Sequence, residues 1–379
     1  MPAFWPFTRG APPGAAGVPP EPFPIMEDLL RRNVEDVLAV RDQRRRGPSL
    51  LFGGELMLPP ERALPILEQR LRPHGYTPFL RREDGLTWVQ ALPLVGVVEP
   101  RRGGLALGLF LLTVLSTLIA GSGAFGAFNP FTEPLRLLDG APFAFTLLLI
   151  LGTHEFGHYL TARAYGAQVS LPYFIPAPPP FLFGTLGAVI RLRSPARDRN
   201  ALFDIAAAGP LAGLVVALPA LWIGLGWSTV GAIPASGSLV FGDSLLMRAF
   251  VYLMFGSIPA GMDVFVHPVA LAGWVGLFVT ALNLFPVGQL DGGRIAYALF
   301  GRRHRAVSVA TFVLLLLLAA LTGSLNWVVW AALLFFLIGF HHAPPLDDLT
   351  PLSPGRYATG VLCLILLVLL IPPVPIQLN

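Results

Sequence analysis

Residues 147–160 read LLLILGTHEFGHYL and set a His-Glu-x-x-His motif inside a run of residues suited to hydrocarbon. On a helix, residues four apart share a face, so His154 and His158 can present ring nitrogens to one metal ion. Glu155 would then lie beside the water that such an ion binds, which is typical of a metallohydrolase. Inserting a carboxylate deep in a membrane helix costs ~2.5–3.5 kcal/mol of free energy, so we do not expect Glu155 to lack a function. The alternative is a chance pair of histidines bonded to neighbouring helices.

The composition predicts a polytopic α-helical membrane protein. Of 379 residues, 54% are hydrophobic and 13% are charged, whereas ordinary globular chains carry about 25% charged residues. The net charge of +4 could suggest nucleic acid, but most arginines fall where membrane topology would place them, so we expect no nucleic-acid partner. Cys363 is the single cysteine, which excludes internal disulfides and cysteine-based metal sites.

The N-terminal quarter differs from the rest of the chain. Residues 1–24, rich in Pro, Gly and Ala, predict a disordered tail. Residues 25–99 predict a small soluble α/β domain of βαββ type on the cytoplasmic side. Its expected elements are a helix over Glu27–Val40, a strand over Ser49–Leu58, a helix over Pro60–Arg72 and a hairpin of Tyr76–Arg81 with Leu86–Leu92.

Six to seven transmembrane helices are expected after this domain, since a ~30 Å core needs spans of about 20 residues. We divide the region into a core over 104–300, which carries the metallohydrolase motif, and additional C-terminal transmembrane helices over 301–379. The apolar stretch 245–260 is interrupted by Gly256 and Pro259 and predicts a partial or surface helix. The expected spans are 104–120, 141–165, 203–226, 268–286, 306–322, 326–341 and 357–372.

The arginines predict which side of the membrane each loop faces. Loops on the N-terminal side hold most of them, whereas the opposite loops hold Arg136 and Arg248, so the N-terminal domain is expected in the cytoplasm. All basic residues are arginine, which together with much Ala, Gly and Pro suggests a GC-rich genome, and we expect a bacterial inner membrane. His158 would lie about 26 Å along a helix that enters near Ala141, toward the cytoplasmic side.

A catalytic zinc usually takes three protein ligands, so a third is needed. A downstream glutamate is excluded because Glu155 is the last one, and a histidine six residues after His158 is excluded because Ala164 stands there. Asp291 is the best remaining candidate at matching depth. Four further residues stay open, although they are expected at solvated positions: His341, His342, Asp347 and Asp348. Asp204 opens the third span and is expected to be its N-terminal cap or its dipole partner.

Asp291 lies in the stretch 283–294, NLFPVGQLDGGR, directly after a predicted span. Pro286 bends or ends the helix, and the glycines let irregular backbone pack closely. Such backbone is tolerated at membrane depth where protein or a water cavity surrounds it. The alternative for Asp291 is a turn residue that pairs with Arg294.

The HEFGH of 154–158, followed far downstream by N-x-x-P-x-x-x-x-D-G at 283–292, resembles the site-2 protease family of intramembrane zinc metalloproteases. The segments 203–213 and 184–190 are also similar to that family, and the resemblance covers roughly residues 104–300. It implies one catalytic zinc ion held by His154, His158 and Asp291, with Glu155 as the catalytic base. It also implies that Asn283 aids substrate or oxyanion binding.

The proline-rich stretch between Val169 and Arg193 predicts a re-entrant loop or β-hairpin near the active site, where an unwound substrate could add as a strand. The alternative is a plain connector. The expected function is hydrolysis of peptide bonds in or near transmembrane segments of membrane proteins. Alternatives are a transporter or metal-handling protein with a His/Asp site, and an inactive scaffold. The partners are then transmembrane substrates and the lipid bilayer, and the oligomeric state is not predicted.

Overall fold

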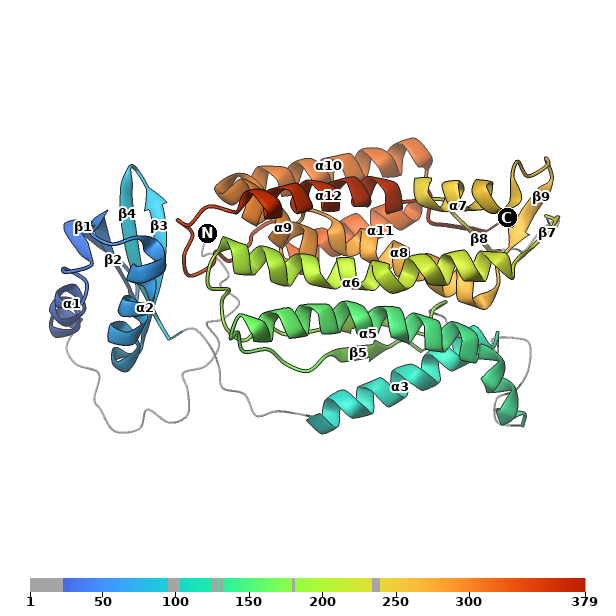
Figure 1. Ribbon diagram of the computed structural model, residues 1–379, viewed down its shortest axis with the longest axis horizontal. Helices are drawn as coiled ribbons and strands as arrows, with labels where there is room; N and C mark the ends of the chain where they lie inside the picture. Colours follow the sequence, from blue (N-terminus) through green and yellow to red (C-terminus); the bar gives the residue numbers. More distant parts are fainter. Residues whose placement is uncertain are drawn as a thin grey trace.

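Long apolar helices make up most of the molecule, and a small α/β domain lies at one end of them (Figure 1). This computed structural model describes residues 23–94, 103–123, 129, 132–178, 181–233 and 239–378. The predicted tail over 1–24 lies outside these residues, except that its last two begin the first helix.

The α/β domain contains an antiparallel sheet of order β1-β2-β4-β3. Asp84 (φ 52°) and Gly85 (φ 81°) form the tight turn of the predicted β3–β4 hairpin, as expected for an Asp-Gly turn between two strands. The elements are α1 (Phe23–Arg32), β1 (Leu38–Arg46), β2 (Ser49–Leu56), α2 (Pro60–Leu71), η1 (Arg72–His74), β3 (Tyr76–Glu83) and β4 (Leu86–Pro93).

The predicted βαββ order is present as β2, α2, β3 and β4, but a further strand, β1, precedes it and pairs with β2. The helix expected over Glu27–Val40 ends at Arg32, and β1 begins at Leu38. Val34 and Leu38 are fully buried, so their helix-like spacing reflects a buried turn rather than a continuing helix. Pairing of β1 with β2 along most of its length outweighs the local spacing.

Among the residues that the structure describes, four helical stretches are long and apolar enough to cross a membrane: Gly103–Gly121, Pro134–Ala164, Arg199–Gly226 and Asp291–Thr322. The chain is therefore a helical membrane protein, as its composition predicts. The helical elements are α3 (Gly103–Gly121), η2 (Pro134–Gly140), α5 (Ala141–Ala164), α6 (Arg199–Gly226), α7 (Leu245–Phe255), α8 (Pro268–Leu284), α9 (Asp291–Phe300), η3 (Gly301–Arg303), α10 (His304–Thr322), α11 (Leu325–Leu333), η4 (Leu334–Ile338) and α12 (Pro354–Leu370).

Short strands lie between and beyond the helices. The chain between α5 and α6 forms the antiparallel pair β5 (Tyr173–Pro176) and β6 (Thr185–Val189), and β5 packs against α3 through Phe174 and Phe110. Two further pairs lie at the end of the bundle away from the α/β domain (Figure 1): β7 (Thr229–Ala232) with β9 (Met262–Phe265), and β8 (Leu239–Phe241) with β10 (Ile376–Leu378).

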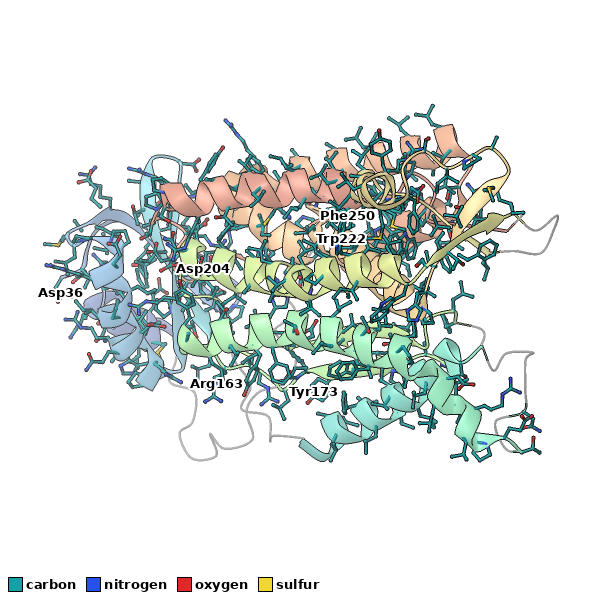
Figure 2. All side chains as sticks on the ribbon, turned by 45° about the vertical axis from the view of Figure 1, so that its right-hand side comes forward. Asp36, Arg163, Tyr173, Asp204, Trp222 and Phe250 are labelled. Carbon is teal, nitrogen blue, oxygen red and sulfur yellow. The ribbon has the colours of Figure 1, made fainter. Side chains whose placement is uncertain are left out.

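The core of the bundle forms where α6 packs between α5 and α8. Glycines bring the helices close, since a Cβ at Gly224 would lie 2.2 Å from the Ala270 backbone nitrogen. Along the bundle, Asp204 lies toward the α/β domain and Trp222, which packs on Phe250, lies farther away (Figure 2).

The segment after η4 fastens the α/β domain to the bundle. Leu80 of β3 bonds with this segment on both sides, donating to the Leu346 carbonyl (2.7 Å) and accepting from Asp348 N–H (3.1 Å). Leu346 is buried in the core of the α/β domain. Asp347 is also buried, and Asp348 accepts from Arg199 (2.8 Å), so the expectation that these aspartates are solvated is wrong.

The expected role of Asp204 at the start of α6 is also corrected. Asp204 was expected to be the N-terminal cap or the dipole partner of the helix, but the cap is Asp198, whose side chain accepts from the Ala201 N–H (2.7 Å). Asp204 instead accepts hydrogen bonds from Arg356 of α12 (2.7 Å) and from Tyr165.

Candidate metal centre

The two histidines of the motif lie on one face of α5, as their spacing predicts. His154 and His158 are 4% and 3% exposed, and their Nε2 atoms are 3.2 Å apart. The Nδ1–H of His158 donates to the Ile205 carbonyl of α6 (2.6 Å). This bond orients the ring and leaves Nε2 free to act as a metal ligand.

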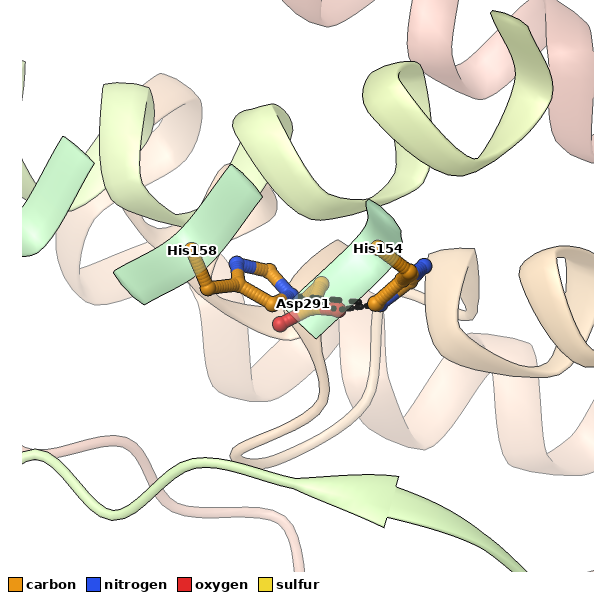
Figure 3. Close-up of side chains that lie close together, drawn as sticks. All are labelled: His154, His158 and Asp291. Atoms are coloured by element: carbon orange, nitrogen blue, oxygen red, sulfur yellow. Dashed lines mark hydrogen bonds and ion pairs between the residues drawn. The ribbon is translucent and has the colours of Figure 1, made fainter. Parts of the chain in front are cut away.

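Asp291 joins the histidines from a distant part of the chain (Figure 3). It is the first residue of α9, and its Oδ2 lies 3.1 Å from His158 Nε2 and 3.5 Å from His154 Nε2. The other oxygen, Oδ1, lies 3.7 Å from Arg294 Nη1. One oxygen of Asp291 therefore faces the histidines and the other faces the arginine, so the geometry is compatible with both interpretations of this residue.

The spacing of these atoms suits a single zinc ion. A tetrahedral zinc with ligands at 2.0–2.1 Å holds neighbouring ligand atoms about 3.3 Å apart. The three separations here, 3.2, 3.1 and 3.5 Å, bracket that value. All three residues are buried and offer nitrogen and oxygen donors that zinc accepts.

Glycines let the loop that carries Asp291 fold tightly. Gly288 has a φ of +54°, a conformation that glycine adopts at little cost. A Cβ at Gly292 would lie 1.9 Å from the Leu284 carbonyl oxygen, and one at Gly293 would lie 2.4 Å from the Gly288 oxygen. The Asp-Gly-Gly sequence is thus required by backbone packing after α8.

Asn283 lies in the last turn of α8 and also reaches the centre. Its Nδ2 is 3.2 Å from His154 Nε2. The structure therefore brings together all five residues that the sequence singled out, including Glu155, which neighbours His154 on α5 and is 5% exposed. His341, His342, Asp347 and Asp348 lie outside the metal-binding group.

The chain that follows β6 lies beside Glu155. Backbone bonds join Arg191 to Ser170, whose N–H donates to the Arg191 carbonyl (3.0 Å), on the β5 side. The next residue back, Ile190, hydrogen-bonds through its backbone to the Glu155 carboxyl group. Because adjacent residues of an extended chain point their backbone groups to opposite sides, the segment just after β6 faces Ser170 on one side and Glu155 on the other.

Several contacts at this centre are not evident in the sequence. The Ile205 carbonyl and the Ile190 backbone belong to apolar residues whose side chains give no sign of a polar role. Gly209 and Gly213 of α6 pack against the α5 face that bears the histidines.

A helical membrane bundle that buries two imidazoles and a carboxylate at zinc spacing, with a second carboxylate beside them, defines a membrane protein with a metal centre of the metallohydrolase type. Residues 142–324 match the model of peptidase family M50. The chain belongs to that family, the site-2 protease family, as its motifs indicate.

Curated relatives agree with this assignment. The chain is 31% identical over 378 residues to the probable zinc metalloprotease EGY2, chloroplastic, of Arabidopsis thaliana, covering 92% of this chain and 65% of that protein. It is 34% identical over 298 residues to the probable zinc metalloprotease EGY1, chloroplastic, of the same plant, covering 71% and 53%. The probable zinc metalloprotease EGY3, chloroplastic, of Oryza sativa subsp. indica is 30% identical, covering 89% and 62%.

The chain thus spans less than two thirds of the length of these relatives. No solved structure matches it.

Proposed function

We propose that this protein is a zinc metalloendopeptidase that hydrolyses peptide bonds in or near transmembrane segments of membrane proteins. The observation that carries the proposal is the convergence of His154 Nε2, His158 Nε2 and Asp291 Oδ2 within 3.5 Å of one another, deep in a bundle of apolar helices. The family assignment and the printed names of the relatives support the same activity.

His154, His158 and Asp291 would hold the ion. Zinc bound there would lower the pKa of a water molecule toward about 7 and polarise the scissile carbonyl. The Glu155 carboxylate then accepts a proton from the attacking water and passes it to the nitrogen of the leaving amine. Its position next to His154 on α5, with the carboxyl group held by the Ile190 backbone, supports this role.

Asn283 is proposed to bind the carbonyl oxygen of the scissile bond. Its amide nitrogen already lies 3.2 Å from His154 Nε2, at the rim of the metal-binding group. An amide N–H in this position can donate a hydrogen bond to the oxygen as negative charge develops on it.

The substrate is proposed to bind as an extended strand along the open edge of β6. The backbone N–H and C=O groups of a helical substrate hydrogen-bond within the helix, so the segment must unwind before cleavage. Backbone hydrogen bonds to an added strand offset the free-energy cost of unwinding. Within the described residues, β6 pairs with β5 alone. The chain that continues from β6 contacts Glu155 through Ile190, so a strand added along the unpaired edge of β6 and continuing past its end would pass the reacting groups.

The proposal extends to topology and location. We keep six to seven spans, a soluble domain over 25–99 on the arginine-rich side, a protease core over 104–300 and further membrane helices over 301–379. The names of the relatives describe those proteins as chloroplastic and do not support the expected bacterial inner membrane. The proposal is therefore limited to an integral membrane location.

The test combines metal content with cleavage. Purified protein should contain one zinc per chain and cut a model transmembrane peptide, and a chelator should remove the zinc and stop the cutting. Zinc without cleavage would favour a metal-handling protein. A chain without zinc that transports a solute, or does neither, would contradict the proposal.

A further inference from the structure

A cavity of about 270 Å³ opens beside the metal centre. One wall is the chain that continues from β6, including Arg191, Leu192 and Ser194. The opposite wall is formed by Arg294 and by His342 with the residues that follow it. Neither wall belongs to the metal-binding group, and the mechanism above uses none of these side chains.

The cavity continues directly from the proposed path of the substrate. Ile190, whose backbone bonds to Glu155, lines it, and so does Arg294, which contacts Asp291 at 3.7 Å. The next lining residues, Pro195 and Ala196, lead to the segment that fastens the α/β domain, since Ala196 accepts from the Leu346 N–H (2.9 Å). An extended chain that leaves the centre toward the α/β domain therefore enters this cavity.

The charge of the cavity is positive. Two arginines line it, and none of its described lining residues is acidic. Burial, followed by the charge of Arg294, lowers the pKa of His342 to about 3, so the ring stays neutral. His342 Nδ1 is buried and has no hydrogen-bond partner among the described residues. Two cations and a neutral ring nitrogen are suited to an anionic group with several acceptor oxygens.

We propose that this cavity is a specificity subsite that binds an acidic side chain, Asp or Glu, of the substrate on the flank nearer the α/β domain. The inference rests on the proposed peptidase function and names the substrate class that the site favours. Arg191 is the residue to test, because it is exposed at the cavity wall and distant in sequence from the metal-binding residues. Arg294 is unsuitable, because it contacts Asp291.

Binding is measured with the full chain carrying Glu155→Gln, which holds the peptide uncut, in neutral-lipid nanodiscs. The probe is a fluorescent transmembrane peptide with a single Glu, or a matched Gln, placed at successive flanking positions. Glu at one position should tighten binding about tenfold at low salt, and the gain should shrink as salt is raised. Arg191→Gln should abolish the gain, and Arg191→Glu should make Lys the preferred residue at that position.

Arg305→Gln is the matched control, since Arg305 is an exposed arginine that does not line this cavity. Each variant should retain one zinc per chain, which shows that the centre is intact. The subsite is refuted if Glu and Gln bind equally at every position, if Arg191→Gln keeps the preference, or if Arg305→Gln removes it equally. It is also refuted if Arg191→Gln instead weakens attachment to anionic vesicles and leaves peptide binding unchanged.

The same peptides separate this inference from the proposed function. With Glu155 present, chelator-sensitive cleavage that is indifferent to the acidic residue contradicts the subsite and leaves the peptidase intact. Binding that depends on the Glu residue of the peptide, without cleavage of any peptide, would contradict the proposed peptidase function and support the subsite.

Discussion

Gly209 of α6 lies against the ring of His158: a Cβ atom at position 209 would be 2.1 Å from His158 Nε2. That distance is far below van der Waals contact, so any side chain at 209 must displace the imidazole. Helix α6 thus has two roles at the centre, since it leaves space for the ring through Gly209 and orients it through the Ile205 carbonyl.

Gly209→Ala should therefore weaken zinc binding by about 10- to 100-fold, the range found when metal ligands lose their proper orientation. Zinc content after dialysis against a graded chelator measures this effect. Gly226→Ala at the end of the same helix is the control, because a Cβ there meets nothing within 4 Å. Equal zinc affinity in the two variants would contradict the close contact.

Asp291→Asn keeps the shape of the side chain but removes its charge. Zinc affinity should fall by about 100-fold or more, because the ion loses an anionic ligand. Asp204→Asn provides the comparison, since Asp204 is a partly buried carboxylate that accepts hydrogen bonds from Arg356 and lies outside the metal-binding group. If the Asp291→Asn protein holds zinc as firmly as the Asp204→Asn protein, the ligand assignment is wrong.

Leu346→Ala should loosen the α/β domain from the bundle. Removing this buried side chain costs about 2–3 kcal/mol of the docking free energy, and the Leu80 N–H that donates to the Leu346 carbonyl should become accessible. Hydrogen exchange of β3 amides reports the change. Met57→Ala, at an exposed apolar residue of the same domain, should leave the exchange unaltered, and protection that survives in Leu346→Ala would refute the docking role.

His342 predicts a pH dependence of stability. Burial lowers its pKa to about 3, below the unfolded value of about 6.5, so the unfolded chain binds the proton more readily. The contribution of His342 to the free energy of unfolding is complete above pH 6.5 and is lost as the pH falls toward 3. When the pH is lowered from 7.5 to 5.5, the free energy of unfolding should fall by about 1.4 kcal/mol more in the native protein than in the His342→Gln variant.

Denaturant unfolding in detergent at the two pH values measures this difference. The neighbouring exposed histidine gives the control variant His341→Gln, which should follow the native protein. A native protein and a His342→Gln variant with the same pH dependence would show that the His342 ring is not excluded from protonation.

Local patterns predicted the parts of the molecule that depend on neighbouring residues. The apolar runs placed the helices, because span length is set by the membrane core. The four-residue spacing of His154 and His158 placed both rings on one face, because helix geometry fixes it. Asp291 was found by exclusion and by its glycine-rich loop, although the contact joins positions 133 residues apart.

Features that depend on tertiary contacts could not be predicted from local sequence patterns. β1 was missed because buried Val34 and Leu38 have helical spacing. The segment forms a strand because it pairs with β2, and this pairing is not visible in the local sequence. Asp347 appeared solvated because the surrounding sequence is polar, yet docking of the segment on β3 buries it. The Ile205 carbonyl that orients His158 is a backbone group, which every residue carries.

The most direct test of the central claim is Glu155→Gln, measured for zinc content and for cleavage of a model transmembrane peptide in the same sample. We expect one zinc per chain, as in the native protein, together with loss of cleavage, because the amide cannot accept the proton from water. A Glu155→Gln protein that retains its zinc and cuts the peptide at the native rate would show that Glu155 is not the catalytic base.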